Sequence, residues 1–139
     1  MKFLVTDDEL LTVKMLQRLL SRYGHCDYVL NGKEAVEAFK EALSMGEPYD
    51  LIFMDILMPE MDGFDALYAI REKEKMLGIN QEDSVKIIMM TGLGISIEMV
   101  NLYRTSCMEF LYKPIDVDAL ISFLKDNNLI QQGIEYNNN

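Results

Sequence analysis

The sequence lacks several features that would point to particular classes of protein. It has no tryptophan, one histidine and two cysteines, and no apolar run approaches the length needed to cross a bilayer. Residues 1–5 run straight into acidic residues at Asp7 and Asp8, so they lack the long apolar core of a signal peptide. These absences predict a soluble, cytoplasmic protein with no membrane partner.

Basic residues are also scarce. Thirteen Lys and Arg stand against 23 Asp and Glu, which gives a formal net charge of −10. Without a basic patch there is little to release counterions from a phosphate backbone, so we expect no nucleic-acid partner. The acidic excess is compatible with a metal ion or a basic protein surface. The length of 139 residues fits one compact domain.

The few cysteine and histidine residues form no motif. Cys26 and Cys107 do not have metal-ligand spacing, which predicts two small hydrophobic side chains in a reducing compartment. His25 follows Gly24 in an expected loop with no second histidine nearby, so we expect a surface histidine.

What the sequence does contain is a strict alternation of apolar runs and helical patterns. The apolar runs indicate five strands, and the segments between them repeat apolar residues at helical spacing. The expected strands cover residues 2–6, 26–30, 50–55, 85–91 and 107–112, and the expected helices cover residues 9–23, 32–43, 62–75, 96–104 and 116–126. Continuous apolar strands separated by helices predict a parallel sheet covered on both faces, a three-layer α/β sandwich.

The carboxyl-terminal residues do not continue this pattern. We expect one folded domain over residues 1–127, followed by a polar tail over residues 128–139 that is rich in asparagine. Because nothing after the fifth expected helix resembles a flexible linker, we expect no second domain. An initiating Met1 just before the first strand favours a complete short protein.

Polar residues stand at the carboxyl ends of four expected strands, where open parallel sheets bind their ligands. They are Asp7, Asp8, Asp55, Thr91 and Lys113. Taken singly, each has a structural explanation, such as a helix cap, a turn, a strand residue or a solvated charge. Taken together, three carboxylates at one edge repel each other unless a cation is present. Oxygen ligands of this kind suit a hard cation such as Mg²⁺, or Mn²⁺.

Across residues 1–127 the sequence resembles the receiver domains of bacterial two-component response regulators. The matching motifs, in order, are Asp7-Asp8, Asp55, residues 58–63 (MPEMDG), Thr91 and Lys113-Pro114. Each motif is short, but their order and their placement after the right strands make the match specific. The resemblance implies a flavodoxin-like fold, with a five-stranded parallel sheet of order 2-1-3-4-5 and five helices.

The resemblance also implies a role for each residue at the strand ends. Asp55 would be the phosphoacceptor, taking a phosphoryl group from a phosphohistidine on a histidine kinase or a histidine phosphotransfer protein. Lys113 and Thr91 would contact the phosphoryl oxygens. The implied metal ligands are Asp7, Asp8, Asp55 and the backbone carbonyl of Leu57.

A conformational output follows from the same resemblance. Thr91 would move toward the phosphoryl group and Phe110, which also fits plain core packing, would turn inward behind it. Pro114 implies a cis peptide bond after Lys113, which aims the lysine into the site. The signal would leave from the face formed by the fourth helix, the fifth strand and the fifth helix, to a downstream protein. The implied state is a monomer or weak dimer.

The segment that follows Thr91 is unusually apolar. Residues 95–103 hold more apolar side chains than one buried stripe needs, which favours a binding face. An irregular helix after Gly92 and Gly94 is the alternative. Leu57 and Leu93 occupy positions that in the family often carry polar groups beside the attacking water. Apolar side chains cannot orient that water, so we expect slow self-dephosphorylation.

Three other functions share parts of this pattern. A haloacid-dehalogenase-type phosphatase needs a second aspartate two residues after the nucleophile, where this chain has Leu57. A flavodoxin-type FMN carrier needs a phosphate loop where Asp7 and Asp8 would repel phosphate. The third alternative is a degenerate receiver that serves only as a binding module. The presence of all five site residues argues against it. We expect a phosphoacceptor that is not an enzyme, apart from its own phosphoryl transfer and slow dephosphorylation.

Overall fold

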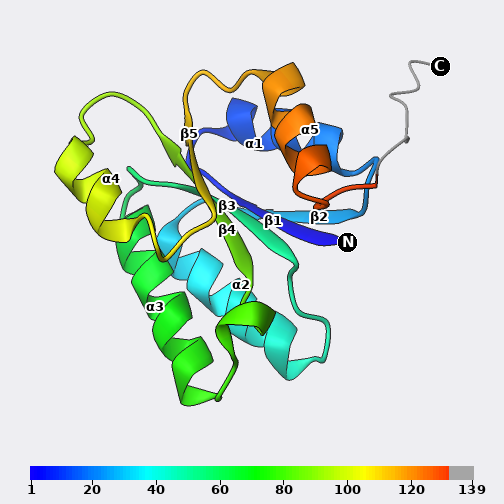
Figure 1. The fold of residues 1–139 in the computed structure, drawn as a ribbon, viewed down its shortest axis with the longest axis vertical. Coiled ribbons are helices and arrows are strands. Elements are labelled where there is room, and N and C mark those ends of the chain that lie inside the picture. Colours follow the sequence, from blue (N-terminus) through cyan, green and yellow to red (C-terminus); the bar gives the residue numbers. More distant parts are fainter. Residues whose placement is uncertain (132–139) are drawn as a thin grey trace.

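A computed structural model describes residues 1–131 and shows a three-layer α/β sandwich (Figure 1). Its strands are β1 (Lys2–Thr6), β2 (His25–Val29), β3 (Leu51–Asp55), β4 (Lys86–Thr91) and β5 (Glu109–Tyr112). They form one parallel sheet in the order β2-β1-β3-β4-β5. The expected flavodoxin-like strand order is confirmed.

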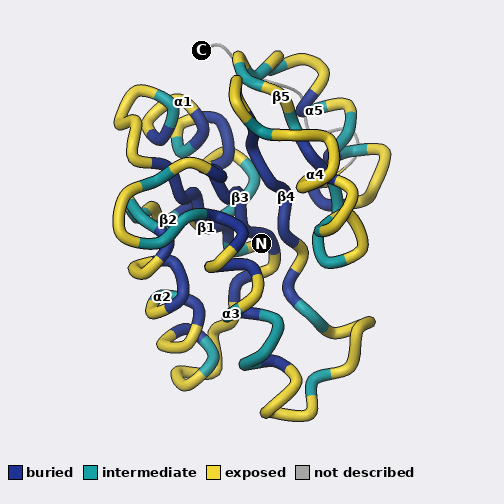
Figure 2. The backbone as a smooth tube through the Cα atoms, turned by 90° about the vertical axis from the view of Figure 1, so that its left-hand side faces the viewer, coloured by how far each residue is buried: buried dark blue, intermediate teal, exposed yellow. Residues whose placement is uncertain are grey.

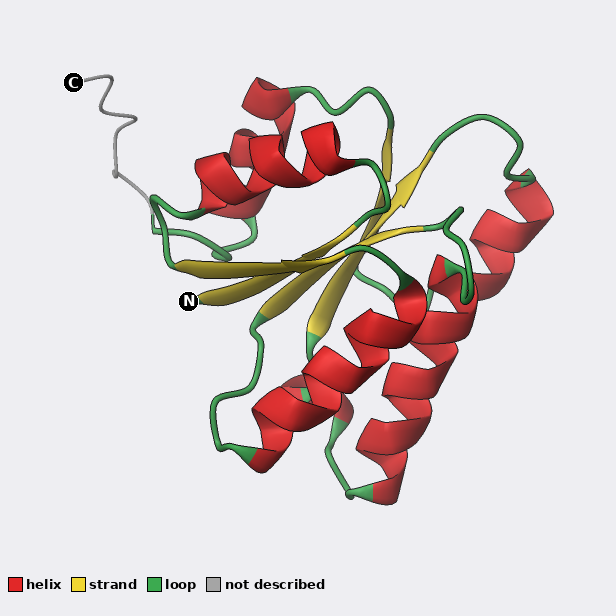
Figure 3. Ribbon diagram, turned by 180° about the vertical axis from the view of Figure 1, so that it is seen from behind, coloured by secondary structure: helices red, strands yellow, loops and turns green. Residues whose placement is uncertain are grey.

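The helices lie on both faces of this sheet, as Figure 3 shows. They are α1 (Leu10–Leu20), α2 (Gly32–Ser44), α3 (Gly63–Met76), α4 (Ile97–Tyr103) and α5 (Val117–Asp126), with a short 3₁₀ turn, η1 (Gln81–Asp83), before β4. Helices α1 and α5 pack over one core cluster, and α2, α3 and α4 pack over the other. Five helices in two outer layers were expected from the sequence.

The central strands are buried on both faces, which explains their continuous apolar sequence. All five residues of β3 are buried, because β3 has neighbouring strands on each side and helices above and below it. Figure 2 shows the same dark core through β1, β3 and β4. Successive residues point to opposite faces, so Phe3 packs with α1 and α5 while Leu4 packs with α2 and α3.

Four helices begin with a side-chain cap that the sequence supplies. The capping residues are Asn31, Asp62, Ser96 and Asp116, and each accepts a hydrogen bond from the backbone N–H three residues further on. Helix α1 differs, because its N-cap residue Glu9 makes no such bond. Instead, the N–H of Glu9 donates to Oδ1 of Asp7 at 2.9 Å. The start of α1 is therefore tied to a carboxylate at the strand ends.

The segment between α1 and β2 differs from the sequence-based expectation. Helix α1 ends at Leu20, three residues before the expected end, and His25 begins β2 instead of lying in a loop. His25 is exposed, as expected, and its Nε2 lies 2.7 Å from Oδ1 of Asp27. Gly24 allows the backbone of Met1 to pass close by, since a Cβ at residue 24 would lie 2.2 Å from the carbonyl oxygen of Met1.

The chain remains packed beyond the expected domain boundary at residue 127. Leu129 and Ile130 are buried in the cluster with α1 and α5. Most of the tail that we expect, from residue 132 onward, lies outside the described residues. Within the described part, no helix combines the length and apolar character needed to span a membrane.

Candidate functional site

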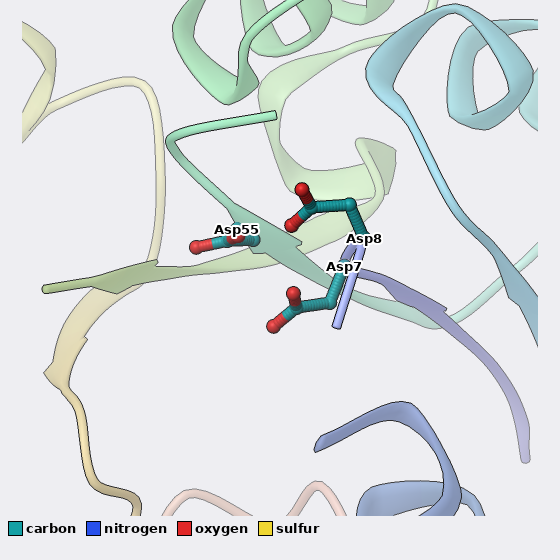
Figure 4. A group of neighbouring side chains, drawn as sticks. All are labelled: Asp7, Asp8 and Asp55. Atoms are coloured by element: carbon teal, nitrogen blue, oxygen red, sulfur yellow. The ribbon is translucent and has the colours of Figure 1, made fainter. Parts of the chain in front are cut away.

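Three carboxylates meet beyond the ends of β1 and β3, which are neighbours in the sheet. Asp7 and Asp8 follow β1, and Asp55 is the last residue of β3. Their carboxylate oxygens include a set that lies within 4.8 Å of one another, and Figure 4 shows the three groups gathered at this edge. Asp7 and Asp55 are buried, whereas Asp8 is exposed. The sheet topology thus brings together the acidic residues that the sequence singled out.

Lys113 reaches this cluster from the end of β5. Its Nζ lies 2.7 Å from Oδ2 of Asp7 and 3.2 Å from Oδ1 of Asp55. Its backbone N–H donates to the carbonyl of Thr91 at 2.8 Å, and the Lys113–Pro114 peptide is cis, as expected. Burial alone would lower the pKa of Lys113. The contacts with Asp7 and Asp55 outweigh that effect, so the pKa lies above its usual value. The site therefore holds a fixed positive charge.

One lysine does not neutralise two buried carboxylates. Burial and the nearby charge of Asp7 raise the pKa of Asp55 to about 7, although Lys113 opposes this rise. A further cation would relieve this repulsion. The donors available are oxygens alone, and the exposed Asp8 can be reached from solvent. This donor set fits a hard divalent ion such as Mg²⁺.

Thr91 and Phe110 lie on β4 and β5, the two strands that follow β3 toward one edge of the sheet. Thr91 is buried at the end of β4, and its hydroxyl donates to the carbonyl of Gly92 at 3.3 Å. Phe110 is buried on β5, opposite Met89, with the guanidinium carbon of Arg104 5.6 Å from its ring centre. The alternation of β4 puts Thr91 on the same face as Met89, the face that Phe110 also covers. Their roles as a switch remain predictions.

Two leucines stand in the loops that follow β3 and β4. Leu57 follows β3 and is 58% exposed, and Leu93 follows β4 and is 97% exposed. Both side chains are therefore open to solvent, Leu57 two residues after Asp55 and Leu93 two residues after Thr91. The expected role of the Leu57 carbonyl as a metal ligand remains a prediction.

The turn from Asp55 into α3 contains a close contact that sequence reasoning did not identify. The N–H of Gly63 donates to the carbonyl of Ile56 at 2.7 Å. A Cβ at Gly63 would lie 2.2 Å from the carbonyl oxygen of Asp55. The available signal was the glycine of the MPEMDG motif, because a glycine permits backbones to approach this closely. Helix α3 thus starts directly against the backbone of Asp55.

A buried ion pair further along α3 was also missed. Glu74 is 4% exposed, and its Oε1 accepts a hydrogen bond from Nη1 of Arg71 at 2.7 Å. Nε of Arg71 donates to the carbonyl of Ser106 at 2.9 Å. A basic and an acidic residue three apart on a helix usually form a surface pair, so their spacing alone does not indicate burial.

These observations define a class of protein: a doubly wound parallel sheet with a cluster of carboxylates that could hold a cation and a lysine at its carboxyl edge. The family model of the response regulator receiver domain matches residues 3–125. The chain belongs to this family, whose members act in two-component signalling. Receiver domains are phosphorylated on an aspartate and bind Mg²⁺ at an acidic pocket.

The chain matches two kinds of relatives, regulators of which it covers most of the length and hybrid kinases of which it covers a small part. Chemotaxis protein CheY of Thermotoga maritima is 30% identical over 125 residues, which cover 88% of this chain and 93% of that protein. Two-component response regulator 24 of Arabidopsis thaliana is 35% identical over 136 residues, 93% of this chain and 85% of that protein. Hybrid signal transduction histidine kinase L of Dictyostelium discoideum is 32% identical over 139 residues, 97% of this chain. The chain spans only 8% of that kinase and 6% of hybrid kinase B of the same organism.

Solved structures show the same fold. CheY in the CheX–CheY–BeF₃–Mg²⁺ complex of Borrelia burgdorferi aligns with a TM-score of 0.73 at 26% identity, covering 94% of this chain and 90% of that one. The Mg²⁺ complex of the receiver domain of the histidine kinase CKI1 from Arabidopsis thaliana aligns with a TM-score of 0.69 at 29% identity. That alignment covers 89% of this chain and 91% of the other.

Proposed function

We propose that Asp55 accepts a phosphoryl group from a phosphohistidine on a histidine kinase or a histidine phosphotransfer protein, in a reaction that depends on Mg²⁺. The position of the Asp55 carboxylate carries this proposal. It ends the fully buried strand β3, lies in the cluster with Asp7 and Asp8, and has Nζ of Lys113 3.2 Å from one oxygen. A nucleophile, candidate metal ligands and a counter-charge thus share one site.

The chemistry asks chiefly for positioning and charge neutralisation. An oxygen of Asp55 forms the new bond to phosphorus while the bond from phosphorus to the imidazole nitrogen breaks, and that nitrogen takes up a proton. The chain would hold Mg²⁺, which supplies positive charge to the phosphoryl oxygens when bound, through Asp7, Asp8, Asp55 and the Leu57 carbonyl. Lys113 already contacts Asp55, so its ammonium group is in place to pair with an oxygen of the acyl phosphate.

The output we propose runs through Thr91 and Phe110 to the face formed by α4, β5 and α5. Thr91 would turn its hydroxyl toward the phosphoryl group, and Phe110 would occupy the space behind it. Apolar exposure supports this face: Ile97 and Leu102 on α4 are 64% and 67% exposed. Helix α4 is regular over its seven residues, so the exposure does not come from an irregular helix. A downstream protein would bind there.

The exposed side chains of Leu57 and Leu93 support a long-lived acyl phosphate. Neither can hydrogen-bond the water that would attack phosphorus. We therefore propose slow self-dephosphorylation, and no other enzymatic activity. The half-life of the phosphorylated protein measures this directly, and loss of the group within seconds would contradict it.

The match to nearly all of CheY from Thermotoga maritima supports a single-domain regulator. The monomer or weak dimer expected from the sequence stays a prediction. The match to small parts of hybrid kinases supports the alternative, a receiver module that serves an attached or partner kinase. The cytoplasmic location expected from the sequence stays a prediction.

Mass spectrometry of the intact protein tests the proposed function. Incubation with Mg²⁺ and acetyl phosphate should add one phosphoryl group, about 80 Da, to the wild type. Asp55→Asn should show no addition, because its amide cannot act as the nucleophile. Chelating the metal with EDTA should abolish the addition in the wild type. An unmodified wild type, or an adduct that persists in Asp55→Asn, would contradict the proposal.

A further inference from the structure

Helix α3 spans the distance from the phosphoacceptor to the entry of β5. Its first residue, Gly63, packs against the backbone of Asp55. Arg71 lies eight residues, or about two turns, further along the same helix. Figure 1 shows α4 beside the first half of α3, with the connection from α4 to β5 passing alongside α3. One rigid element thus contacts both the site and the start of the edge strand.

The guanidinium group of Arg71 joins three separate segments. Its Nε donates to the carbonyl of Ser106 at 2.9 Å, in the connection between α4 and β5. Its Nη1 donates to the carbonyl of Val85 at 2.8 Å, just before β4, and to Oε1 of Glu74 at 2.7 Å. A single side chain on α3 therefore ties down the entries of β4 and β5.

Glu74 keeps this arrangement in one geometry. Its second oxygen accepts the N–H of Val85 at 2.7 Å, so both oxygens of the buried carboxylate have donors. The side chains of Arg71 and Glu74 are 24% and 5% exposed. A buried ion pair of this kind often adds little net stability compared with apolar residues, because both charges lose water. The pair therefore acts chiefly by fixing the geometry of the segments that it joins.

Strand β5 needs such a tether because it is short and lies at the sheet edge. It has four residues and pairs with β4 on one side. Its entry is held by the N–H of Met108, which donates to the carbonyl of Ile87 at 2.7 Å, and by the bond from Arg71 to Ser106. Lys113 follows this strand directly and contacts Asp55. A shift of β5 would therefore move Lys113 relative to Asp55.

We infer that Arg71 is a positioning residue: by holding Ser106 against α3, it sets where β5 lies and hence where Lys113 stands relative to Asp55. The inference rests on the proposed function, since it concerns the rate at which Asp55 is phosphorylated. A second contact also holds this region against α3. The rings of Phe64 on α3 and Tyr103 on α4 stack with their centres 4.4 Å apart. The end of α4 is thereby fixed to the same helix.

Two variants of Arg71 separate positioning from stability. Arg71→Lys keeps a positive charge beside Glu74 but has one nitrogen in place of three, so it cannot also hold Ser106. The pair Arg71→Met and Glu74→Gln leaves no buried charge unpaired, and its glutamine oxygen can still accept from Val85. Both should reduce the rate of phosphorylation at saturating acetyl phosphate and Mg²⁺ by about threefold to tenfold, since small misplacements of reacting groups are costly. The KM for acetyl phosphate and the affinity for Mg²⁺ should stay unchanged.

Amide hydrogen exchange supplies the structural readout. In both variants, the amides of residues 108–112 should exchange faster than in the wild type, while those of β1 and β3 keep their rates. Val36→Ala is the matched control, because it removes buried volume from α2. It should lower the midpoint of urea unfolding and leave the rate of phosphorylation unchanged.

The outcomes distinguish this inference from the proposed function. A wild type that is not phosphorylated would end the proposed function itself. If the wild type is phosphorylated and both Arg71 variants react at the rate of the wild type, the positioning role alone is overturned. A loss of rate that comes with weaker Mg²⁺ binding, or that Val36→Ala shares, would also overturn it, because the effect would then be a general loosening of the fold.

Discussion

At the scale of single residues, the chemistry of Asp55 comes from the charges around it. Asp7 lies close enough to repel it, and Lys113 contacts both carboxylates. The Asp7 carboxylate is already engaged on both oxygens, by Lys113 and by the N–H of Glu9. Asp8 is exposed and has no such partner among the described residues, which leaves it open to a cation from solvent.

The raised pKa of Asp55 predicts how the metal-free protein responds to pH. Burial and Asp7 raise this pKa to about 7 in the folded protein, whereas an aspartate in an unfolded chain titrates near pH ~4. Between these values the folded state binds the extra proton, so the contribution of Asp55 to stability is fully present below about pH 4 and declines as the pH rises to about 7.

Urea unfolding in EDTA, compared between wild type and Asp55→Asn, isolates this effect. The free energy of unfolding of the wild type should fall relative to the variant across this range, by about 1 kcal/mol or more. Above pH 7 the difference should level off. A difference that stays constant from pH 4 to 7 would show that Asp55 is already ionised in acid.

Thr6 places a hydroxyl group in the core next to the site. It is fully buried, and its Oγ1 has no hydrogen-bond partner among the described residues. Burying an unpaired hydroxyl is costly, so Thr6→Val should raise the free energy of unfolding by about 1 kcal/mol in urea titrations followed by circular dichroism. Thr12→Val is the control, because the hydroxyl of Thr12 donates to Glu9 and its loss should not stabilise. Equal effects of the two substitutions would contradict this account.

At the scale of elements, the junction between β3 and α3 is the tightest point of the fold near the site. Gly63→Ala would put a Cβ 2.2 Å from the carbonyl oxygen of Asp55, so α3 or the strand end must move. We expect a loss of stability of about 3 kcal/mol or more, as for other overpacked sites. The matched control is Gly92→Ala, where the added Cβ meets nothing within 4 Å. Thermal unfolding of both variants checks this, and a tolerated Gly63→Ala would show that the turn is pliable.

The elements themselves could be predicted well from the sequence because apolar periodicity follows burial. Strand β1 has the expected bounds, and β3, β4 and the helices differ by a few residues. The ends of helices and strands are harder to predict where contacts with residues distant in the sequence determine them. Gly24 does not end α1 but makes room for the carbonyl of Met1, and only the folded backbone reveals that approach.

The location of the site could be predicted from the sequence, but the contacts between its side chains could not. The topology of a parallel sheet brings the ends of β1, β3 and β5 to one edge, so the grouping of Asp7, Asp55 and Lys113 was expected. That Lys113 contacts Asp7 more closely than Asp55 depends on side-chain placement. The burial of Glu74 with Arg71 likewise had no signal in the sequence, because local spacing does not tell which face of a helix meets a neighbouring loop.

At the scale of the whole molecule, the strand ends concentrate negative charge in a chain that is already acidic, with a formal net charge of −10. The folded state assembles the carboxylates of Asp7, Asp8 and Asp55, whereas the unfolded chain separates them. A cation that binds this cluster therefore binds the folded state preferentially, and by linkage it must stabilise the fold. At tenfold the dissociation constant, Mg²⁺ should add about 1.4 kcal/mol to the free energy of unfolding.

Thermal unfolding at constant ionic strength measures this stabilisation separately from general screening of the acidic surface. The midpoint should rise with the concentration of MgCl₂ and not with NaCl of equal ionic strength. Asp8→Asn should weaken the response, because it removes the exposed carboxylate of the cluster. Glu37→Gln removes an exposed carboxylate on α2, away from the strand ends, and should keep the response. If Glu37→Gln weakened it as much as Asp8→Asn, Mg²⁺ would be acting through the overall charge of the protein and not through a site.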